Sequence, residues 1–157
     1  MYNKTSETDG SRYIPYDERT GNESLVYFTR DLSPEGLIKI YNRICNRLTG
    51  KIAVKLHTGE KNGPNIIPPE WVEKLIKKEI PEGTIIETNT YYEGDRYTTE
   101  RHRETLKVNG WTFCPVDIID SDGTAKLTVN DGKWFDFMSV GKNLLNYNSL
   151  FGNSAIL

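Results

Sequence analysis

Apolar residues change their spacing several times along the chain, and these changes predict alternating strands and helices. Short runs rich in β-branched and aromatic residues predict strands over 25–29, 51–57, 84–88 and 113–119. Between these runs, apolar residues recur at helical spacings from 34 to 48 and again from 69 to 80. A weaker helix is expected from Thr98 or Thr99 to Asn109, because Leu106 and Val108 are its only aliphatic residues.

Residues that favour particular backbone positions support these boundaries. Ser33 is placed to cap the first helix and Pro34 suits its first turn. Pro68 and Pro69 open the second helix in the same way. Proline cannot donate a hydrogen bond to a sheet, so Pro115 predicts either an edge position or an irregular start for the fourth strand.

Four strands separated by three helices predict parallel pairing through right-handed crossovers. We therefore expect the α/β class, with a three-layer, Rossmann-like, mostly parallel sheet. After Asp120 the pattern changes to short strands over 125–129 and 134–140, and the Asp-Gly between them predicts a C-terminal β-hairpin. Residues 1–23 lack either periodicity and are expected to form a flexible N-terminal extension to a single domain over 24–157.

Charge and hydropathy narrow the partners that we expect. Twenty Lys and Arg residues face 22 Asp and Glu residues, so the net charge is −2 and no basic block predicts nucleic-acid binding. No apolar run approaches the roughly 20 residues that span a bilayer, and the N-terminus is polar. A cytoplasmic protein that binds neither membrane nor nucleic acid is therefore predicted.

The two cysteines, Cys45 and Cys114, are 69 positions apart and form no C-x-x-C pair. A cysteine-ligated iron-sulfur or zinc site needs about four suitably placed ligands, so none is expected within this chain. Both cysteines are interpreted as small buried hydrophobic residues in a reducing compartment.

Polar residues gather where the predicted strands end. In open parallel sheets, ligands bind outside the carboxyl ends of the strands, where loops and helix N-termini converge. The residues at these ends are Arg30, Asp31, His57, Thr58, Gly59, Glu60, Glu87, Asn89, Asp117 and Asp120. This edge is where a binding site is expected.

Several of these residues also have a purely structural interpretation. Lys55, within an apolar strand, either pairs with a carboxylate such as Glu87 on the neighbouring strand or reaches an anionic ligand. His57 is a candidate ligand, general base or packing residue. The run from Thr58 to Glu60 offers backbone N–H groups for an anion, yet a single glycine is more typical of a simple turn than of a phosphate-binding loop.

The segment before the third helix adds further candidates. Arg96 could complete an anion site with the hydroxyl groups of Thr98 and Thr99, or it could simply be an exposed arginine. His102 lies on the same helical face as Thr98 and Thr99. With His57 and Glu87 it is a candidate ligand of a divalent metal, although no local metal-binding motif is present.

Several segments together resemble the N-terminal part of the family called domain of unknown function 362. The resemblance covers about 25 to 148 and rests on the order and spacing of Val26 to Leu37, Lys51 to Glu60, Glu87 to Tyr91, Thr98 and Thr99 with His102, Gly110-Trp111, and Val116 to Asp120. Members of that family are described as uncharacterised iron-sulfur centre proteins with a ferredoxin-like cysteine-rich segment after this region.

This chain lacks the cysteine-rich run and stops soon after Leu150, so the resemblance implies a shortened form without the iron-sulfur centre. The site residues to which it points are Lys55, His57, Glu60, Asn89, Arg96, Thr99 and His102.

Two functions of different classes follow as hypotheses. In the first, the domain binds a small anionic ligand or a metal through Lys55, His57, Thr58, Gly59, Glu60, Asn89, Arg96 and Thr99. In this hypothesis, His57, Glu60 and His102 are the candidates for proton transfer, but the sequence does not identify a reaction. In the second, the chain is a non-catalytic assembly module, a remnant of a larger iron-sulfur protein that forms homo-oligomers through its apolar C-terminal region.

Overall fold

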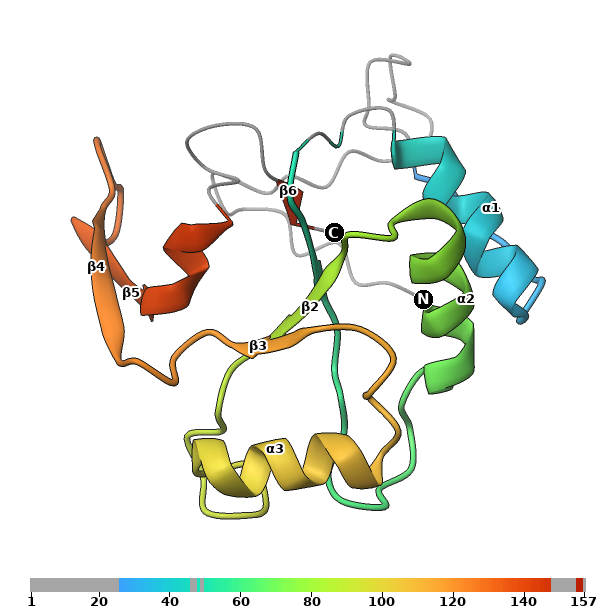
Figure 1. Ribbon diagram of the computed structural model, residues 1–157. Coiled ribbons are helices and arrows are strands. Elements are labelled where there is room, and N and C mark those ends of the chain that lie inside the picture. Colours follow the sequence, from blue (N-terminus) through green and yellow to red (C-terminus); the bar gives the residue numbers. More distant parts are fainter. Residues whose placement is uncertain (1–25, 46–47, 49, 148–154, 157) are drawn as a thin grey trace, which may run out of the picture.

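The structure is a computed structural model, and it describes residues 26–45, 48, 50–147 and 155–156. From the first helix onward, helices and strands alternate: α1 (Pro34–Ile44), β1 (Ile52–Lys55), α2 (Pro69–Glu79), β2 (Thr84–Glu87), α3 (Thr99–Val108) and β3 (Val116–Ile118). Then follow β4 (Thr124–Thr128), β5 (Phe137–Gly141), the 3-10 helix η3 (Lys142–Asn146) and β6 (Ala155–Ile156) (Figure 1). The predicted extension over 1–23 lies outside the described residues, as does the tail at Leu150.

The helices begin where the sequence predicts. The Ser33 hydroxyl accepts a hydrogen bond from the Gly36 backbone N–H at 3.1 Å, and a proline occupies the first turn of both α1 and α2. The Thr98 hydroxyl caps α3 by accepting from the Arg101 N–H at 3.4 Å. Helix α1 ends at Ile44, earlier than the apolar pattern predicts. None of the helices among the described residues is long and apolar enough to cross a bilayer.

The main sheet is parallel and has the strand order β3-β2-β1-β6. Val54 of β1 lies opposite Ile85 of β2, and Ile85 in turn lies opposite Val116 of β3. Strand β3 follows Pro115 and lies at an edge of the sheet, which is one of the two positions predicted for it. The antiparallel pair of β4 and β5 forms a separate sheet, which confirms the predicted hairpin.

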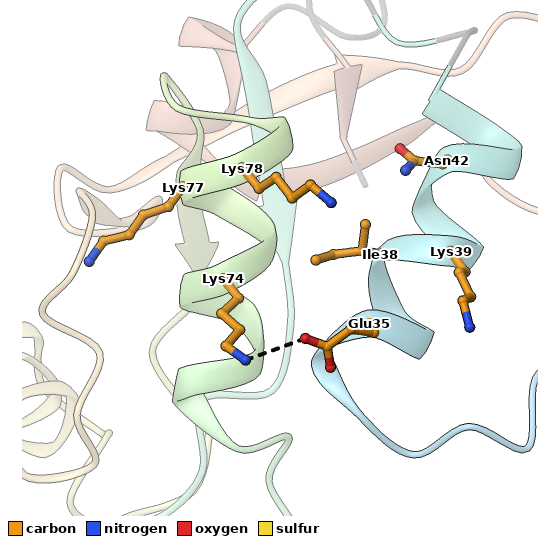
Figure 2. Close-up of a pocket in the computed structure, with 7 residues that line it drawn as sticks. All are labelled: Glu35, Ile38, Lys39, Asn42, Lys74, Lys77 and Lys78. Atoms are coloured by element: carbon orange, nitrogen blue, oxygen red, sulfur yellow. Dashed lines mark hydrogen bonds and ion pairs between the residues drawn. The ribbon is translucent and has the colours of Figure 1, made fainter.

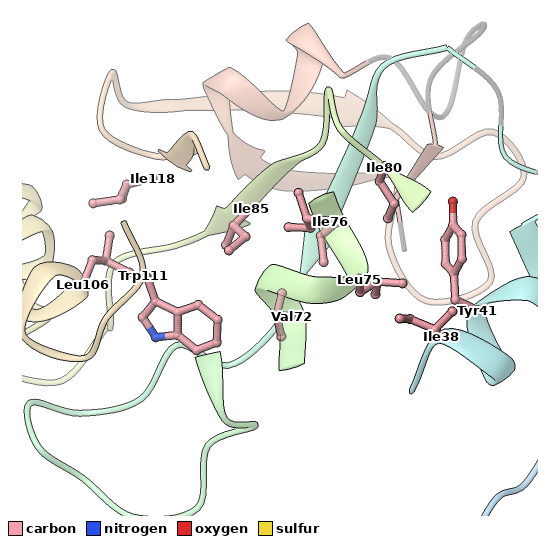
Figure 3. Close-up of a cluster of buried hydrophobic side chains, with 11 residues drawn as sticks. Ile38, Tyr41, Val72, Leu75, Ile76, Ile80, Ile85, Leu106, Trp111 and Ile118 are labelled. Carbon is pink, nitrogen blue, oxygen red and sulfur yellow. The ribbon is translucent and has the colours of Figure 1, made fainter. Parts of the chain in front are cut away.

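The main core lies between one face of the parallel sheet and the three α-helices. It joins side chains of α1, α2, α3 and the sheet, among them Ile38, Tyr41, Val72, Leu75, Ile76, Leu106, Val54, Ile85 and Ile118 (Figure 3). A smaller cluster joins Ala53, Ile86 and Ile119 to Tyr147, so η3 and the residue after it contribute to the other side.

This arrangement follows from the order of the strands. Strands β1, β2 and β3 follow one another in the same direction across the sheet, and right-handed crossovers in one direction place their helices on one face. The predicted α/β class, the mostly parallel sheet and the hairpin are confirmed. The three-layer, Rossmann-like arrangement is not confirmed, because the three α-helices share one core cluster.

The first predicted strand is wrong for the residues that can be described. Val26–Thr29 form no strand, and the side chains of Val26 and Phe28 are 88% and 81% exposed. A high β-propensity reports how well side chains fit a pleated, half-buried surface, and it produces a strand only where a neighbouring strand supplies hydrogen bonds. No described residue pairs with the backbone of this segment.

Candidate functional site

Glu87, the last residue of β2, places a buried carboxylate at the carboxyl edge of the sheet. Its Oε2 accepts from Lys55 Nζ at 3.2 Å and from the Thr88 backbone N–H at 2.9 Å. Its Oε1 accepts from the Thr58 backbone N–H at 3.3 Å and lies 3.4 Å from Arg96 Nη1. A carboxylate tolerates burial when it is paired and hydrogen-bonded in this way. The predicted pairing of Lys55 with Glu87 is thus confirmed.

Arg96 connects this buried carboxylate to a second one. Its Nε and Nη2 donate to Glu60 Oε1 at 3.0 and 2.6 Å, and the Tyr92 hydroxyl donates to the same oxygen at 2.7 Å. Arg96 itself is buried, so its interpretation as an exposed arginine is wrong. The guanidinium therefore holds together β2, the loop after β1 and the loop before α3.

Arg96 is paired with Glu60 and Glu87, and the α3 threonines of the predicted anion site each accept a hydrogen bond within the protein. The Thr98 hydroxyl is occupied as the cap of α3, and the Thr99 hydroxyl accepts from Asn89 Nδ2 at 2.9 Å. The Asn89 backbone N–H donates to Asp120 Oδ1 at 2.9 Å. Thr99 and Asn89 therefore attach α3 to the ends of β2 and β3.

The loop from Thr58 to Asn62 is fixed from the far end of α3. Asn109 Nδ2 donates to the carbonyl groups of Thr58, Gly59 and Glu60 at 3.1, 3.3 and 2.9 Å. Asn109 Oδ1 accepts from the Asn62 backbone N–H at 2.9 Å. These contacts fix the backbone that carries Glu60.

Trp111 and Gly59 fix the same loop more tightly. Trp111 Nε1 donates to the Thr58 carbonyl at 2.8 Å. Gly59 has a φ of +84°, and a Cβ there would collide with the side chain of Ile66. Glycine alone adopts this conformation without strain. The turn itself lies at Glu60–Gly63, where the Gly63 backbone N–H donates to the Glu60 carbonyl at 2.8 Å, and so it comes after the predicted position at Thr58 to Glu60.

His102 is fully buried beneath this network on α3. Its Nδ1 lies 3.3 Å from Asn89 Oδ1, and because Asn89 Nδ2 already donates to Thr99, Nδ1 is the ring nitrogen that carries the proton. Nε2 then has a lone pair, and no described residue donates a hydrogen bond to it.

The environment sets the protonation of the titratable groups. Hydrogen bonds from Arg96, and then from Tyr92, hold the pKa of Glu60 below its ordinary value. Burial opposes the charge on Arg96, but its hydrogen bonds to Glu60 and Tyr92 raise its pKa. Burial lowers the pKa of His102, and the nearby charge of Arg96 lowers it further, against the opposing effects of Glu87, Asp120 and Glu60. At neutral pH, Glu60 is therefore an acceptor and His102 is neutral.

The two histidines lie in different environments. His57 is exposed just after β1, whereas His102 is a buried residue of α3. Among the described residues, no group of three His, Cys, Asp or Glu side chains could hold a metal ion. His57, Glu87 and His102 are therefore not arranged as the predicted metal site.

Two further residues at the strand ends take structural roles. Asp120 accepts from the Asn89 backbone, as described above, and Asp117 accepts from the Tyr147 hydroxyl at 2.9 Å and lies 3.3 Å from Asn143 Nδ2. Burial, followed by the Asp117 hydrogen bond, raises the pKa of Tyr147. Asp117 therefore anchors η3 rather than the network around Glu87.

A groove between α1 and α2 is a separate feature, with a volume of about 590 Å³. It is lined by Glu35, Ile38, Lys39, Asn42, Lys74, Lys77 and Lys78 (Figure 2). Each lysine has a carboxylate within 4 Å: the partners of Lys39, Lys74, Lys77 and Lys78 are Asp31, Glu35, Glu73 and Glu79. Pairing thus balances the positive charge that lines this groove.

Sequence reasoning missed two residues that organise the site. Asn109 was interpreted only as the end of α3, yet its side chain binds three carbonyl groups. Tyr92 was not singled out, although its hydroxyl completes the contacts of Glu60. Neither residue has a sequence signal for this role, because their partners lie 47 to 51 and 32 positions away in the chain.

The sequence matches no family model, no curated protein and no solved structure. The resemblance to the domain of unknown function 362 family accordingly stays a prediction.

Proposed function

We propose that the carboxyl edge of β1 and β2 binds a small anionic ligand, with Lys55 as its principal contact. The observation that carries this proposal is the state of the Lys55 ammonium group. It is held by Glu87 Oε2 at 3.2 Å and by the Leu56 carbonyl at 3.4 Å, yet its side chain remains 46% exposed. An ammonium group has three donors, so one hydrogen faces solvent in a fixed position.

Neighbouring side chains complete the proposed site. The exposed His57 follows Lys55 in the chain, and the side chain of Glu60 is 43% exposed with its Oε1 already saturated by Arg96 and Tyr92. The second carboxylate oxygen of Glu60 is then available to accept from a ligand hydroxyl or amine. A small carboxylate or phosphate that also carries a hydroxyl group fits this pair of contacts.

The charges of the site set how such a ligand would be held. Lys55 and Arg96 contribute +2, and Glu60 and Glu87 contribute −2, so the four groups sum to zero. Binding would therefore depend on directional hydrogen bonds from Lys55 and His57 more than on net charge. These side chains indicate how a ligand would be bound, but they do not identify a reaction.

Isothermal titration with inorganic phosphate and with glycolate tests this proposal. We expect saturable binding that is lost in Lys55→Gln, which removes the charge and shortens the side chain by one atom. Lys74→Gln is the matched control, since Lys74 lies in the groove between α1 and α2 and pairs with Glu35 at 3.4 Å. Equal loss in both variants, or no binding by the unmodified protein, would contradict the proposal.

A second candidate function, assembly, is favoured by the β4–β5 hairpin. Trp134 is 83% exposed, and Phe135, Phe137 and Met138 are also exposed. Contiguous exposed apolar residues often mark a surface that contacts another protein. Sedimentation over a range of concentrations tests this: self-association that is weakened in Trp134→Ser supports it, and a monomer at every concentration counts against it.

A further inference from the structure

The loop between β2 and α3 holds Tyr92 in one position at the carboxyl edge of the sheet (Figure 1). The Thr90 backbone N–H donates to the Arg96 carbonyl at 3.0 Å, which closes the loop, and the Thr90 hydroxyl donates to the Tyr92 carbonyl at 3.0 Å. Within the loop, the Tyr97 backbone N–H donates to the Gly94 carbonyl at 3.2 Å. The backbone that carries Tyr92 is therefore fixed from both sides.

The side chain of Tyr92 is fixed as well. Its hydroxyl donates to Glu60 Oε1 at 2.7 Å and accepts from Arg96 Nη2 at 3.2 Å. A Cβ on Gly94 would lie 3.8 Å from Tyr92 Cε2, so the backbone at Gly94 supports one edge of the ring. Tyr92 nevertheless remains 58% exposed. Because its hydroxyl contacts the protein, this exposed surface belongs largely to the apolar ring.

A rigid aromatic ring that is open to solvent is suited to pack against a ring of a ligand. Tyr92 loses little side-chain freedom on binding, because the protein already fixes its position. It lies beside the second carboxylate oxygen of Glu60, which is available to accept from a ligand donor. The carbon–hydrogen bonds on the face of a sugar pack against an aromatic ring, and sugar hydroxyl groups donate to carboxylates. Tyr92 and Glu60 together offer both kinds of contact.

Lys55 lies at the other end of the same hydrogen-bonded network. Glu87 accepts from both Lys55 and Arg96, and Arg96 in turn donates to Glu60. A sugar that packs on Tyr92 and carries an acid group could therefore use both ends of the network. The exposed ammonium hydrogen of Lys55 would bind the acid group, as in the function proposed above.

We propose that the carboxyl edge binds an anionic sugar, with Tyr92 against the sugar ring, Glu60 accepting from its hydroxyl groups and Lys55 binding its carboxylate or phosphate. This ligand class rests on the function proposed above and adds the ring contact to it. Glu60 favours a sugar over a nucleobase, because hydroxyl donors surround a sugar ring whereas adenine presents a single amino group.

Isothermal titration with two pairs of anions tests the contact with the ring. Glucuronate and glucose-6-phosphate contain a sugar ring, whereas gluconate and glycerol-3-phosphate carry the same acid groups on open chains. We expect the ring-containing member of one pair to bind about threefold or more tightly than its open-chain partner, and that pair identifies the acid group. Equal affinities within both pairs would overturn the inference. Tighter binding of adenosine monophosphate than of either sugar would overturn it as well, in favour of a base.

Two substitutions at Tyr92 separate its ring from its hydroxyl group. Tyr92→Phe and Tyr92→Leu both remove the hydroxyl group, but only Tyr92→Leu removes the aromatic ring. We expect the preferred ring-containing anion to bind about threefold or more weakly to Tyr92→Leu than to Tyr92→Phe, and its open-chain partner to bind both variants alike. Tyr91→Leu is the matched control, since Tyr91 is fully exposed on the same loop. Equal binding of the ring-containing anion by the two Tyr92 variants would refute the role of Tyr92.

Lys55→Gln distinguishes the ligand class from the proposed function itself. An unmodified protein that binds none of the four anions, and neither inorganic phosphate nor glycolate, would refute the proposed function. Binding that is lost in Lys55→Gln but is equally tight for rings and open chains would refute only the anionic sugar. Thermal unfolding of the Tyr92 variants checks that they are folded, as the exposure of this side chain leads us to expect.

Discussion

The carboxyl edge of the parallel sheet and the β4–β5 hairpin use their side chains in opposite ways. At the sheet edge, the charged Glu87 and Arg96 are buried and find partners in the protein. On the hairpin, the apolar Trp134 and Phe137 are exposed. The first region has removed polar groups from water, and the second has left apolar groups in it.

This difference shows that the sheet edge stabilises the fold, whereas the hairpin presents a surface for contacts. A buried carboxylate that contacts several elements fixes their positions. If one of these elements moves away, the buried charge is neither paired nor hydrated, which is costly in free energy. Exposed aromatic residues contribute little to the folded state and stay available for contacts. Mutations at the two regions should therefore differ sharply in their effect on stability.

The largest effect is expected for Glu87→Ala. Removing the buried carboxylate leaves Arg96 and Lys55 without a shared partner, so the free energy of unfolding should fall by about 3–5 kcal/mol. Urea denaturation measures it. Glu104→Ala is the control, since its ion pair with Lys61 at 3.0 Å is exposed and should contribute at most about 1 kcal/mol. Similar losses in the two variants would show that Glu87 does not organise the edge.

The two regions can also be compared through two glycines that have a similar backbone conformation. Gly59 in the site loop and Gly123 before β4 have φ angles of +84° and +96°, but only Gly59 would bring a new Cβ into contact with another side chain. Alanine at either position costs about 1–2 kcal/mol for the left-handed backbone. Gly59→Ala should lose about 1–3 kcal/mol more through its collision with Ile66. Equal urea denaturation midpoints for the two variants would contradict the close packing of Gly59 against Ile66.

The stability of the site region should depend on pH through His102. Its folded-state pKa lies below the ordinary value of 6.5, so the unfolded chain binds the proton more readily. The contribution of neutral His102 to the free energy of unfolding is therefore complete above pH 6.5. It is lost as the pH falls below this value, by at most about 1.4 kcal/mol per pH unit for one proton. Urea unfolding at pH 7.5 and 5.5 should show a smaller pH effect in His102→Gln. The same pH effect in both proteins would disprove this origin.

The smallest effect is expected on the hairpin. Trp134→Ser changes a side chain that is mostly in water, so the free energy of unfolding should change by less than about 0.5 kcal/mol. Thermal and urea unfolding both measure this. A loss of several kcal/mol would mean that Trp134 is buried in solution and that the contrast between the two regions is false.

Sequence patterns predicted the elements whose determinants are local. Ser33, Pro34, Pro69 and Thr98 mark the beginnings of helices, and all of them lie where expected. The pairing of Lys55 with Glu87 was also predictable, because both lie near the carboxyl ends of adjacent parallel strands.

Features that depend on distant residues were not predictable in the same way. The side chain of Asn109 binds a loop about 50 positions earlier, and no local pattern specifies that contact. Arg96 was predicted to face an anionic ligand or solvent, but Glu60 and Glu87 of the protein itself occupy it. The strand predicted at Val26–Thr29 is absent because the β-propensity of a segment does not say whether a neighbouring strand pairs with it.

Chemical-shift mapping of the full chain during titration with inorganic phosphate tests the central claim most directly. Binding at the strand ends predicts saturable shifts of the backbone amides of His57, Thr58 and Gly59, with no comparable change along α1 and α2. Shifts confined to Ile38, Asn42 and Lys78 would place the anion in the groove between those helices and would contradict the proposed site.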